Sequence, residues 1–379
     1  MKLLLTVATL LVLSEQCQEI RMIAKDGSVV VGRSMEFATE DSYLLSFPAG
    51  SQHNMPELPN CAESFEFESK YHTFTTRMRL QNGNWSQFDS DGMNSAGLSA
   101  SALHFPEFSY FPENETVRGE NCSNAVSQIR LVEYVLASFA NVHEIREAID
   151  NNTFPMVYSE EDFNMTHPVH YQFVDNSGEG MVLEYTKEGG RRMHNNTIGV
   201  FTNSPTFDWH MENLRNYPQL RNKNREGFSY DFEGEKFFLP SGSGSGLAGI
   251  PGDYMSSSRF VKAAALLRFA DKPQYRSDAV MQTFHLMNAA DIPKGVIRDH
   301  KKSDHEDYVL SDSMYVVVKS LSDGCMYYRA YHDISVRRIC FSNMPMDEMR
   351  FKNMERRWQN SYDDINTDNM EAFEFNDSN

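Results

Sequence analysis

The sequence has few basic residues, no closely paired cysteines and only one long apolar run. Its 35 Lys and Arg residues stand against 53 Asp and Glu residues, and the net charge is −18 at pH 7. This balance argues against a nucleic acid as partner, because a phosphate backbone needs a basic face. The lack of any C-x-x-C spacing argues against a zinc site. Beyond residue 16 no second long apolar run occurs, so we expect no membrane span in the mature chain.

The glycine-rich run at residues 241–246 lacks the features of a phosphate-binding loop. No Gly-Lys-Ser or Gly-Lys-Thr follows it, and the strand–helix context of a dinucleotide-binding fold does not surround it. We therefore interpret residues 222–246 as the least regular internal stretch, a loop without a role in binding nucleotides.

A short apolar leader precedes Cys17. Lys2 and the apolar run Leu3–Leu13 have the form of a secretory signal peptide, which is too short to span a bilayer. Signal cleavage fits better after Ser14 than directly before Cys17. Cleavage there would leave Glu15-Gln16 as a stub, to be removed by a second step, for which autocatalysis is one option.

Removal of that stub would give Cys17 a thiol and an α-amine on one residue. A thiol needs a base to become a thiolate, and an α-amine with a pKa near ~8 can be that base. Cys17 is therefore a candidate N-terminal nucleophile. The alternatives are an ordinary half-cystine and a lipidated cysteine, although Glu15-Gln16 does not provide the small residues that lipidation requires.

The other cysteines form an even set once Cys17 is set aside as catalytic: Cys61, Cys122, Cys325 and Cys340. An even set suits an oxidising compartment. Cys325 and Cys340 are equidistant from an expected turn at His332-Asp333, and residues that face each other in an antiparallel hairpin lie ~4.5–5.5 Å apart. We predict a disulfide there, and one between Cys61 and Cys122 by elimination.

Glycosylation sequons also favour secretion. They occur at Asn84, Asn114, Asn121, Asn151, Asn164, Asn195 and Asn376. Together with the leader, they indicate a secreted or extracytoplasmic glycoprotein.

Strand patterns come first in the chain, helical patterns follow, and strands close it. The expected strands are 19–24, 28–31, 43–47, 71–77, 97–105, 170–174, 181–185, 315–320, 326–331 and 336–341, and the expected helices are 123–142, 256–269 and 277–287. This order indicates an α+β fold with layers of each type.

We divide the chain into three parts: a signal peptide and stub at 1–16, one domain at 17–345, and a tail at 346–379. Residues 361–379 of that tail contain six acidic residues and no Lys or Arg.

Two charged residues follow the expected turn at Asp26-Gly27. Hairpin pairing brings Arg33 and Glu36 back toward Cys17. An arginine beside a thiol favours the thiolate, and a carboxylate can orient an α-amine. A surface ion pair is the alternative interpretation.

Several longer motifs share one pattern. They are Cys17; 32–36 (Gly-Arg-Ser-Met-Glu); 91–94 (Asp-Gly-Met-Asn) with 97–98 (Gly-Leu); 199–210 (Gly-Val-Phe-Thr-Asn-Ser-Pro-Thr-Phe-Asp-Trp-His); 246–253 (Gly-Leu-Ala-Gly-Ile-Pro-Gly-Asp); and 258–260 (Ser-Arg-Phe). This set resembles the choloylglycine hydrolase family, the bile salt hydrolases and penicillin V acylases among the N-terminal-nucleophile (Ntn) hydrolases. The resemblance runs from Cys17 to about Phe341.

The resemblance implies a four-layer αββα sandwich and hydrolysis of a linear carboxamide with Cys17 as nucleophile. Arg33 and Arg259 match the two active-site arginines of the family, and Asn203 matches the asparagine that donates to the oxyanion. No metal or cofactor is needed. The resemblance also implies a homo-oligomer, with a tetramer among the options, through residues 213–244.

The chain departs from the family pattern at two positions. Glu36 replaces the usual aspartate, which keeps the charge and lengthens the side chain by one methylene. His104 stands where bile salt hydrolases tend to carry asparagine and penicillin acylases often carry tyrosine. If the backbone N–H there serves the oxyanion, the side chain is free to shape the pocket. These departures bear on the substrate more than on the mechanism.

The substrate candidates are N-acyl amides such as conjugated bile acids and penicillin V. One alternative is an acylase for N-acyl homoserine lactones or N-acylethanolamines, with the same chemistry and a different acyl pocket. Another is a secreted binding protein without catalytic activity, in which Cys17 is never exposed as the first residue.

Overall fold

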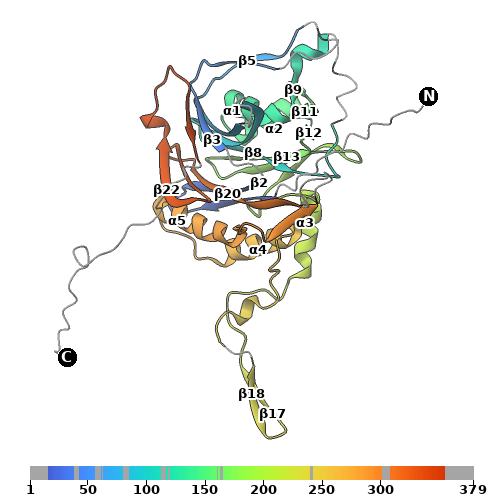
Figure 1. Ribbon diagram of the computed structural model, residues 1–379, viewed down its shortest axis with the longest axis vertical. Coiled ribbons are helices and arrows are strands. Elements are labelled where there is room, and N and C mark those ends of the chain that lie inside the picture. Colours follow the sequence, from blue (N-terminus) through green and yellow to red (C-terminus); the bar gives the residue numbers. More distant parts are fainter. Residues whose placement is uncertain are drawn as a thin grey trace, which may run out of the picture.

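Two large antiparallel sheets lie face to face in the described part of the chain (Figure 1). The computed structural model describes residues 16–37, 42–55, 61, 63–79, 85–111, 117, 120–159, 161–162, 165–239, 242–300 and 308–354. The first sheet has the order β16-β1-β2-β20-β21-β22, with β19 paired to β20; its strands are β1 (Gln16–Ile23), β2 (Val29–Phe37), β16 (Val200–Thr202), β19 (Ile297–His300), β20 (Tyr308–Ser320), β21 (Cys325–Ala330) and β22 (Asp333–Cys340). The second has the order β15-β14-β13-β8-β7-β6-β3-β23; its strands are β3 (Ser42–Phe47), β6 (Thr73–Arg79), β7 (Trp85–Asn94), β8 (Leu98–His104), β13 (Val169–Asp175), β14 (Gly180–Thr186), β15 (Gly190–Asn195) and β23 (Arg350–Asn353).

Helices cover the outer face of each sheet (Figure 1). On the second sheet, α1 (Leu131–Ser138) packs on β7 and β8, and α2 (Val142–Asp150) contacts β13. On the first sheet, α4 (Ser256–Phe269) packs on β1 and β16, and α5 (Arg276–Met287) packs on β2 and β20. A further helix, α3 (Phe207–Asn213), contacts α4. The predicted α+β class and its αββα layers are therefore confirmed.

Smaller elements decorate this sandwich. They are the pairs β4 (Gln52–Asn54) with β5 (Glu66–Glu68), β9 (Ala125–Ser127) with β10 (Met156–Tyr158), β11 (Glu161–Asp162) with β12 (Met165–Thr166), and β17 (Phe228–Phe232) with β18 (Glu235–Leu239), and the short 3-10 helices Glu120–Asn124, Gln128–Arg130, Leu214–Asn216, Ser245–Leu247, Asn288–Ala290 and Phe341–Asn343. The β17–β18 hairpin projects away from the sandwich (Figure 1). No helix within the described residues is both long and apolar enough to cross a membrane.

Two glycines let helices lie close to the sheets. A Cβ at Gly32 on β2 would lie 2.4 Å from the side chain of Thr283 on α5. A Cβ at Gly92 on β7 would lie 2.7 Å from Leu136 on α1 and 2.3 Å from the carbonyl of Phe74. All three distances are shorter than real Cβ contacts, so only glycine fits at either position. This packing accounts for the glycines beside Arg33 and Asp91 in the sequence motifs.

Buried charged side chains join the two sheets. Lys319 on β20 forms ion pairs with Asp91 on β7 and with Glu19 on β1, the second at 3.5 Å. The Glu19 carboxylate also accepts hydrogen bonds from Ser101 and Gln172. Because each charge has a partner of opposite sign or a donor, the group can stay between the sheets without an unpaired ion.

Both predicted disulfides are present. Cys325 and Cys340 face each other in the β21–β22 register, and their Cα atoms are 4.1 Å apart. Cys61 and Cys122 form the second bridge, with Cα atoms 5.8 Å apart. Cys17 lies outside both bridges, which leaves its thiol available for chemistry.

The predicted helix at 123–142 is wrong at its amino end. Residues 125–127 form β9, which pairs in parallel with β10, and α1 covers only residues 131–138. Ser127 accepts a hydrogen bond from the N–H of Ile129 and caps a 3-10 turn instead. Almost every residue from 125 to 138 is buried. Apolar periodicity cannot separate a buried strand from a buried helix in such a stretch.

Residues 222–246 are more regular than we predicted. The sequence Phe-Ser-Tyr-Asp-Phe of β17 alternates apolar and polar residues, and the strand pairs with β18 across a turn at Glu233-Gly234. Both turn residues have positive φ, 53° and 87°. Alternation and a glycine turn are the ordinary signals of a hairpin, which the glycine-rich run after it obscured.

The second sheet continues past residue 345, where we placed the end of the domain. The strand β23 pairs with β3, and Met354 donates its backbone N–H to the Ser42 carbonyl. The leader at 1–15, the acidic residues of 361–379 and the sequons at Asn84, Asn114, Asn164 and Asn376 lie outside the described residues.

The Cys325–Cys340 bridge should contribute to stability through the loop that it closes. We expect the double variant Cys325→Ser, Cys340→Ser to lower the free energy of unfolding by about 3 kcal/mol, since closing a loop of this length restricts the unfolded chain by that amount. Urea unfolding of the two proteins measures the difference. Equal midpoints would contradict the expected contribution.

Candidate active site

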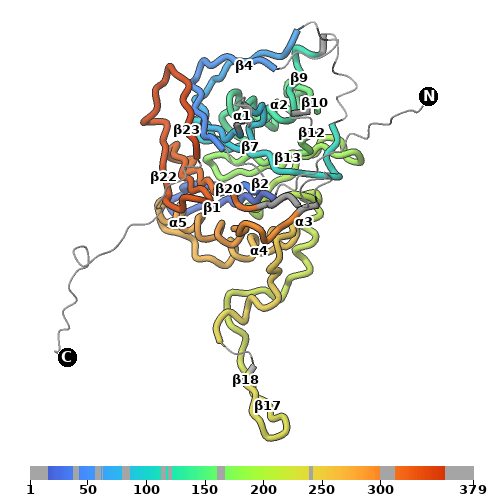
Figure 2. The backbone as a smooth tube through the Cα atoms, in the orientation of Figure 1, coloured from blue at the N-terminus to red at the C-terminus, as the bar shows by residue number. Residues whose placement is uncertain are grey.

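Cys17 lies at the start of β1, buried inside the first sheet. It faces Met35 on β2, and the neighbouring residues of β1 pair with β16 on the other side. Figure 2 shows β1, β2 and β20 running together in the layer above α4. Asn203 follows the last residue of β16 directly, so strand pairing alone brings it beside Cys17.

Four groups contact Cys17 directly. Its backbone N–H donates to Asn203 Oδ1 at 2.8 Å, and its carbonyl accepts from Arg259 Nη1 at 2.6 Å. Its Sγ lies 3.6 Å from Arg33 Nη2 and 3.6 Å from Met35 Sδ. The thiol is thus held against a cation and a soft thioether, while the backbone is fixed from two sides.

Arg33 supplies the positive charge at the thiol. It is fully buried between the sheets, and its Nη2 donates to the Ala102 carbonyl at 3.0 Å. Burial opposes its charge, but attraction to Cys17, followed by Tyr315 and Asp91, raises the pKa of Arg33 above its usual range. By the same attraction, a permanent guanidinium next to Cys17 favours the thiolate over the thiol.

Arg259 and the His104 carbonyl orient the side chain of Asn203. Arg259 Nη2 donates to Asn203 Oδ1 at 2.7 Å, and its Nε donates to the Tyr254 carbonyl at 3.0 Å. Asn203 Nδ2 donates to the His104 carbonyl at 2.9 Å. Each end of the amide therefore has a fixed partner, which sets its orientation at the thiol.

Glu36 is buried on β2, one residue beyond the partner of Cys17. Its Oε1 accepts from Ser313 at 3.3 Å, and Oε2 has no hydrogen-bond partner among the described residues. Burial raises the pKa of Glu36 to about 7, against the opposing effect of Arg259. The carboxyl is therefore close to half protonated at neutral pH in this structure, where Gln16 still precedes Cys17.

The sequence-predicted residues thus meet at one place. Cys17, Arg33, Asn203 and Arg259 are linked by direct contacts, and His104 joins them through its carbonyl. The His104 side chain is itself buried. No group of three or more His, Cys, Asp or Glu residues in the described part of the chain is arranged to hold a metal ion.

Sequence reasoning missed the residues that hold the backbone of Asn203. His210 Nε2 lies 2.9 Å from the Asn203 carbonyl, and Ser256 donates to the same oxygen at 2.9 Å. His170 Nε2 lies 2.9 Å from the Thr202 carbonyl. The backbone carbonyls of Thr202 and Asn203, on the two sides of the Asn203 Cα atom, are therefore both held by side chains.

The surroundings of His210 and Glu184 set the ionisation state of each side chain. Burial lowers the pKa of His210 to about 4, so the ring is neutral at pH 7 and carries its proton on Nε2 to donate to Asn203. Glu184 lies 3.0 Å from His170 Nδ1. Burial opposes ionisation of Glu184, but hydrogen bonds from His170 and His194 lower its pKa to about 2. His210 was visible in the Thr202–His210 motif, whereas nothing in the sequence linked His170 or Glu184 to it.

Comparison with known proteins agrees with this geometry. The profile of linear amide C–N hydrolases, choloylglycine hydrolase family, matches residues 17–354. The chain belongs to this family. It is 29% identical to a bile salt hydrolase/transferase of Clostridium perfringens, over 89% of this chain and 95% of the relative. A 120-residue stretch, 31% of each chain, is 31% identical to a penicillin V acylase of Pectobacterium atrosepticum.

Solved structures show the same fold. A variant of the conjugated bile acid hydrolase from Clostridium perfringens superposes with a TM-score of 0.73 at 25% identity, covering 92% of this chain and 99% of the other. The penicillin V acylase of Agrobacterium tumefaciens superposes with a TM-score of 0.67 at 22% identity, covering 88% and 90%. As a choloylglycine-family protein, the chain is a hydrolase of carbon–nitrogen bonds in linear amides.

The His210 contact can be tested through the rate of hydrolysis. We expect His210→Phe to lower kcat about tenfold with little change in KM, because the Asn203 carbonyl loses one donor and the amide loses its orientation. His210→Gln, which can present an N–H at a similar position, should recover most of the rate. A His210→Phe protein with the wild-type kcat would show that the contact has no effect on the reaction.

The buried carboxyl of Glu36 should make stability depend on pH. The folded chain keeps the Glu36 proton up to a pKa of about 7, whereas the unfolded chain releases it near 4.5. The folded state thus binds more protons between these values, and stability falls as pH rises from about 4.5 to 7. Glu36→Gln should remove up to roughly 3 kcal/mol of that fall. Urea unfolding at pH 5 and pH 8 measures this difference between the unaltered protein and Glu36→Gln, both with Gln16 retained. An equal loss of stability in the two proteins would contradict the raised pKa of Glu36.

Proposed function

We propose that Cys17 becomes the first residue of the mature chain and is the nucleophile of a linear-amide hydrolase. One observation carries the proposal: the backbone nitrogen of Cys17 is held by Asn203 while its thiol lies beside Arg33. Removal of residues 1–16 converts that nitrogen into an α-amine without moving it. The base and the nucleophile then belong to one residue, in contact with a cation that favours the thiolate.

The reaction follows from these positions. The α-amine takes the thiol proton, and the thiolate attacks the carbonyl carbon of the amide. The second Nδ2 hydrogen of Asn203, with the backbone N–H near His104, stabilises the oxyanion. The ammonium protonates the departing amine and leaves a thioester on Cys17. Water, deprotonated by the same amine, then releases the carboxylic acid and restores the thiol.

The substrates that we propose first are conjugated bile acids, followed by penicillin V and other N-acyl amides. The bile salt hydrolase/transferase of Clostridium perfringens, which the chain resembles over nearly its whole length, supports that order. Glu36 and His104 are the positions at which this chain departs from the family pattern. Differences in acyl preference from that relative are therefore expected near these two residues.

Hydrolysis of a panel of amides by the purified mature protein tests the function. We expect release of free amine from at least one member of a panel of conjugated bile acids, penicillin V and N-acyl homoserine lactones. The Cys17→Ala variant should release none. Cys17→Ser should be severely impaired, since a hydroxyl is far harder to deprotonate than a thiol. N-terminal sequencing of active enzyme should begin at Cys17. Active enzyme with a stable Glu15 or Gln16 in first position would refute the proposed nucleophile.

We also propose that the protein is secreted. The leader with the form of a signal peptide supports this location. The two disulfides support it too, since such bridges persist in oxidising compartments.

A homo-oligomer formed through the β17–β18 hairpin is the proposed assembly. The hairpin projects from the body and exposes large aromatic side chains: Phe228, Tyr230, Phe232, Phe237 and Phe238. Clustered exposed aromatic residues are typical of a surface that another protein covers. We expect the triple variant Phe228→Ser, Phe232→Ser, Phe238→Ser to run as a monomer by light scattering, while the unaltered protein is larger. A monomeric unaltered protein would exclude this assembly.

A further inference from the structure

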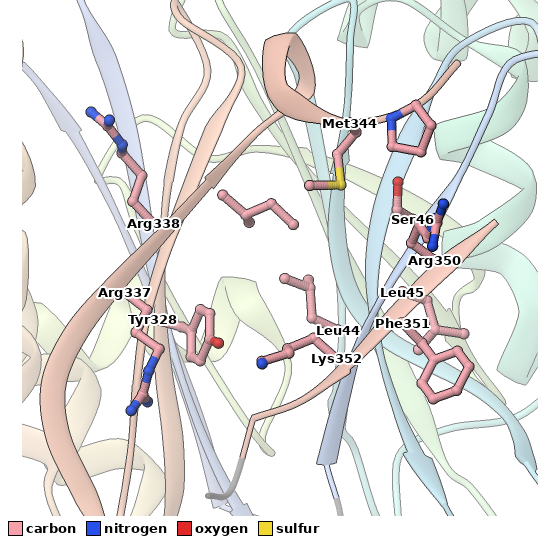
Figure 3. Close-up of a pocket in the computed structure, with 12 residues that line it drawn as sticks. Leu44, Leu45, Ser46, Tyr328, Arg337, Arg338, Met344, Arg350, Phe351 and Lys352 are labelled. Carbon is pink, nitrogen blue, oxygen red and sulfur yellow. The ribbon is translucent and has the colours of Figure 1, made fainter. Parts of the chain in front are cut away.

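An open cavity lies between the two sheets, at the edge away from Cys17. It is bounded by β21 and β22 of the first sheet and by β3 and β23 of the second (Figure 3). In the strand order, β2, β20 and β21 separate β22 from β1. The cavity is therefore distinct from the candidate active site, which lies around β1 and β16.

The cavity is the size of a small-molecule site. Its volume is about 620 Å³, within the range of roughly 300–1,000 Å³ typical of such sites. The residues that line it are Leu44, Leu45, Ser46, Tyr328, Arg337, Arg338, Ile339, Met344, Pro345, Arg350, Phe351 and Lys352. Figure 3 shows Leu44, Met344 and Tyr328 around the central space, with the Lys352 ammonium directed among them. An apolar wall with one inward cation suits a ligand that has both an apolar body and a negative charge.

The charged residues that line the cavity indicate which sign of charge its ligand carries. Four of the lining residues are Arg or Lys and none is Asp or Glu, in a chain whose net charge is −18. Arg337 is paired with Asp333, and Arg350 with Glu348 at 2.5 Å. Arg338 and Lys352 form no salt bridge with any carboxylate in the described residues. Figure 3 shows the Arg338 guanidinium directed away from the central space, so Lys352 is the cation that faces an anion in the cavity.

We propose that this cavity binds an amphipathic carboxylate. The hydrocarbon body lies against Leu44, Ile339 and Met344, where its burial supplies the main part of the affinity. The carboxylate lies at the Lys352 ammonium. A neutral ligand of the same shape would gain only the first contribution, and a cation would be repelled. Binding at this cavity follows from its own residues and does not depend on the proposed nucleophile.

Calorimetric titration of the mature protein with decanoate tests the proposal. We expect saturable binding of one decanoate at the cavity and about tenfold weaker binding of decanol, which lacks the charge, with none of decylammonium. Lys352→Glu should weaken decanoate binding tenfold or more. The matched control is Lys272→Glu, which changes the net charge equally at an exposed position after α4 and should leave the affinity unchanged.

A second variant separates the cavity from the active site. Met344→Trp fills the cavity without altering any group near Cys17, and it should abolish decanoate binding while amide hydrolysis continues. Retention of hydrolysis also shows that this variant folds. The proposal is overturned if decanoate shows no saturable binding, if Lys352→Glu and Lys272→Glu bind it equally, or if active Met344→Trp binds it as well as the unaltered protein.

Discussion

Two buried guanidinium groups, those of Arg33 and Arg259, are the constraint around which the site is built. Each is almost fully removed from water, and neither is paired with a carboxylate at salt-bridge distance among the described residues. Their partners are neutral groups or the reacting thiol: carbonyl oxygens, the Asn203 amide, the Ser90 hydroxyl, and the sulfurs of Met35 and Cys17. Positive charge in a buried place with neutral partners lowers the free energy of any negative charge that forms nearby. Both the thiolate of Cys17 and the oxyanion of a bound amide are such charges.

These arginines can stay buried because the rest of the sandwich supplies balancing charge and fixed backbone. Asp91 and Glu19, which hold Lys319 between the sheets, also attract Arg33. On the other side, His170, His210 and Ser256 hold the carbonyls of Thr202 and Asn203, from which the Asn203 amide projects. The position of that amide is therefore set by its own backbone as well as by Arg259. A side chain held in this way needs no reorganisation when charge develops in the reaction.

The sequence was sufficient where local spacing decides the structure. Cys325 and Cys340 could be paired because the two residues are equally far along the chain from one hairpin turn. Counting residues from the turn at Asp26-Gly27 likewise placed Arg33 near Cys17. Spacing failed at 123–142, since residues buried on all sides show no period that separates strand from helix. Asn203 and Arg259 were found only through long motifs shared with a family. His170 and Glu184 carried no such motif, and only the β13–β14 pairing and the turn into α3 bring them to Thr202.

The contacts of Cys17 in the unprocessed chain match those that the proposed N-terminal nucleophile needs. While Gln16 is attached, the peptide nitrogen has one hydrogen, and that hydrogen is donated to Asn203. A neutral α-amine at the same place has two hydrogens and a lone pair. Keeping the donation to Asn203 still leaves the lone pair available to accept the thiol proton. Removal of residue 16 also places the α-amine of Cys17 near Glu36. The buried Glu36 carboxyl has one oxygen without a hydrogen-bond partner in the described chain. An ammonium there would favour the ionised carboxylate and lower the pKa of Glu36 from its raised value, so removal of residue 16 would stabilise the site that it exposes.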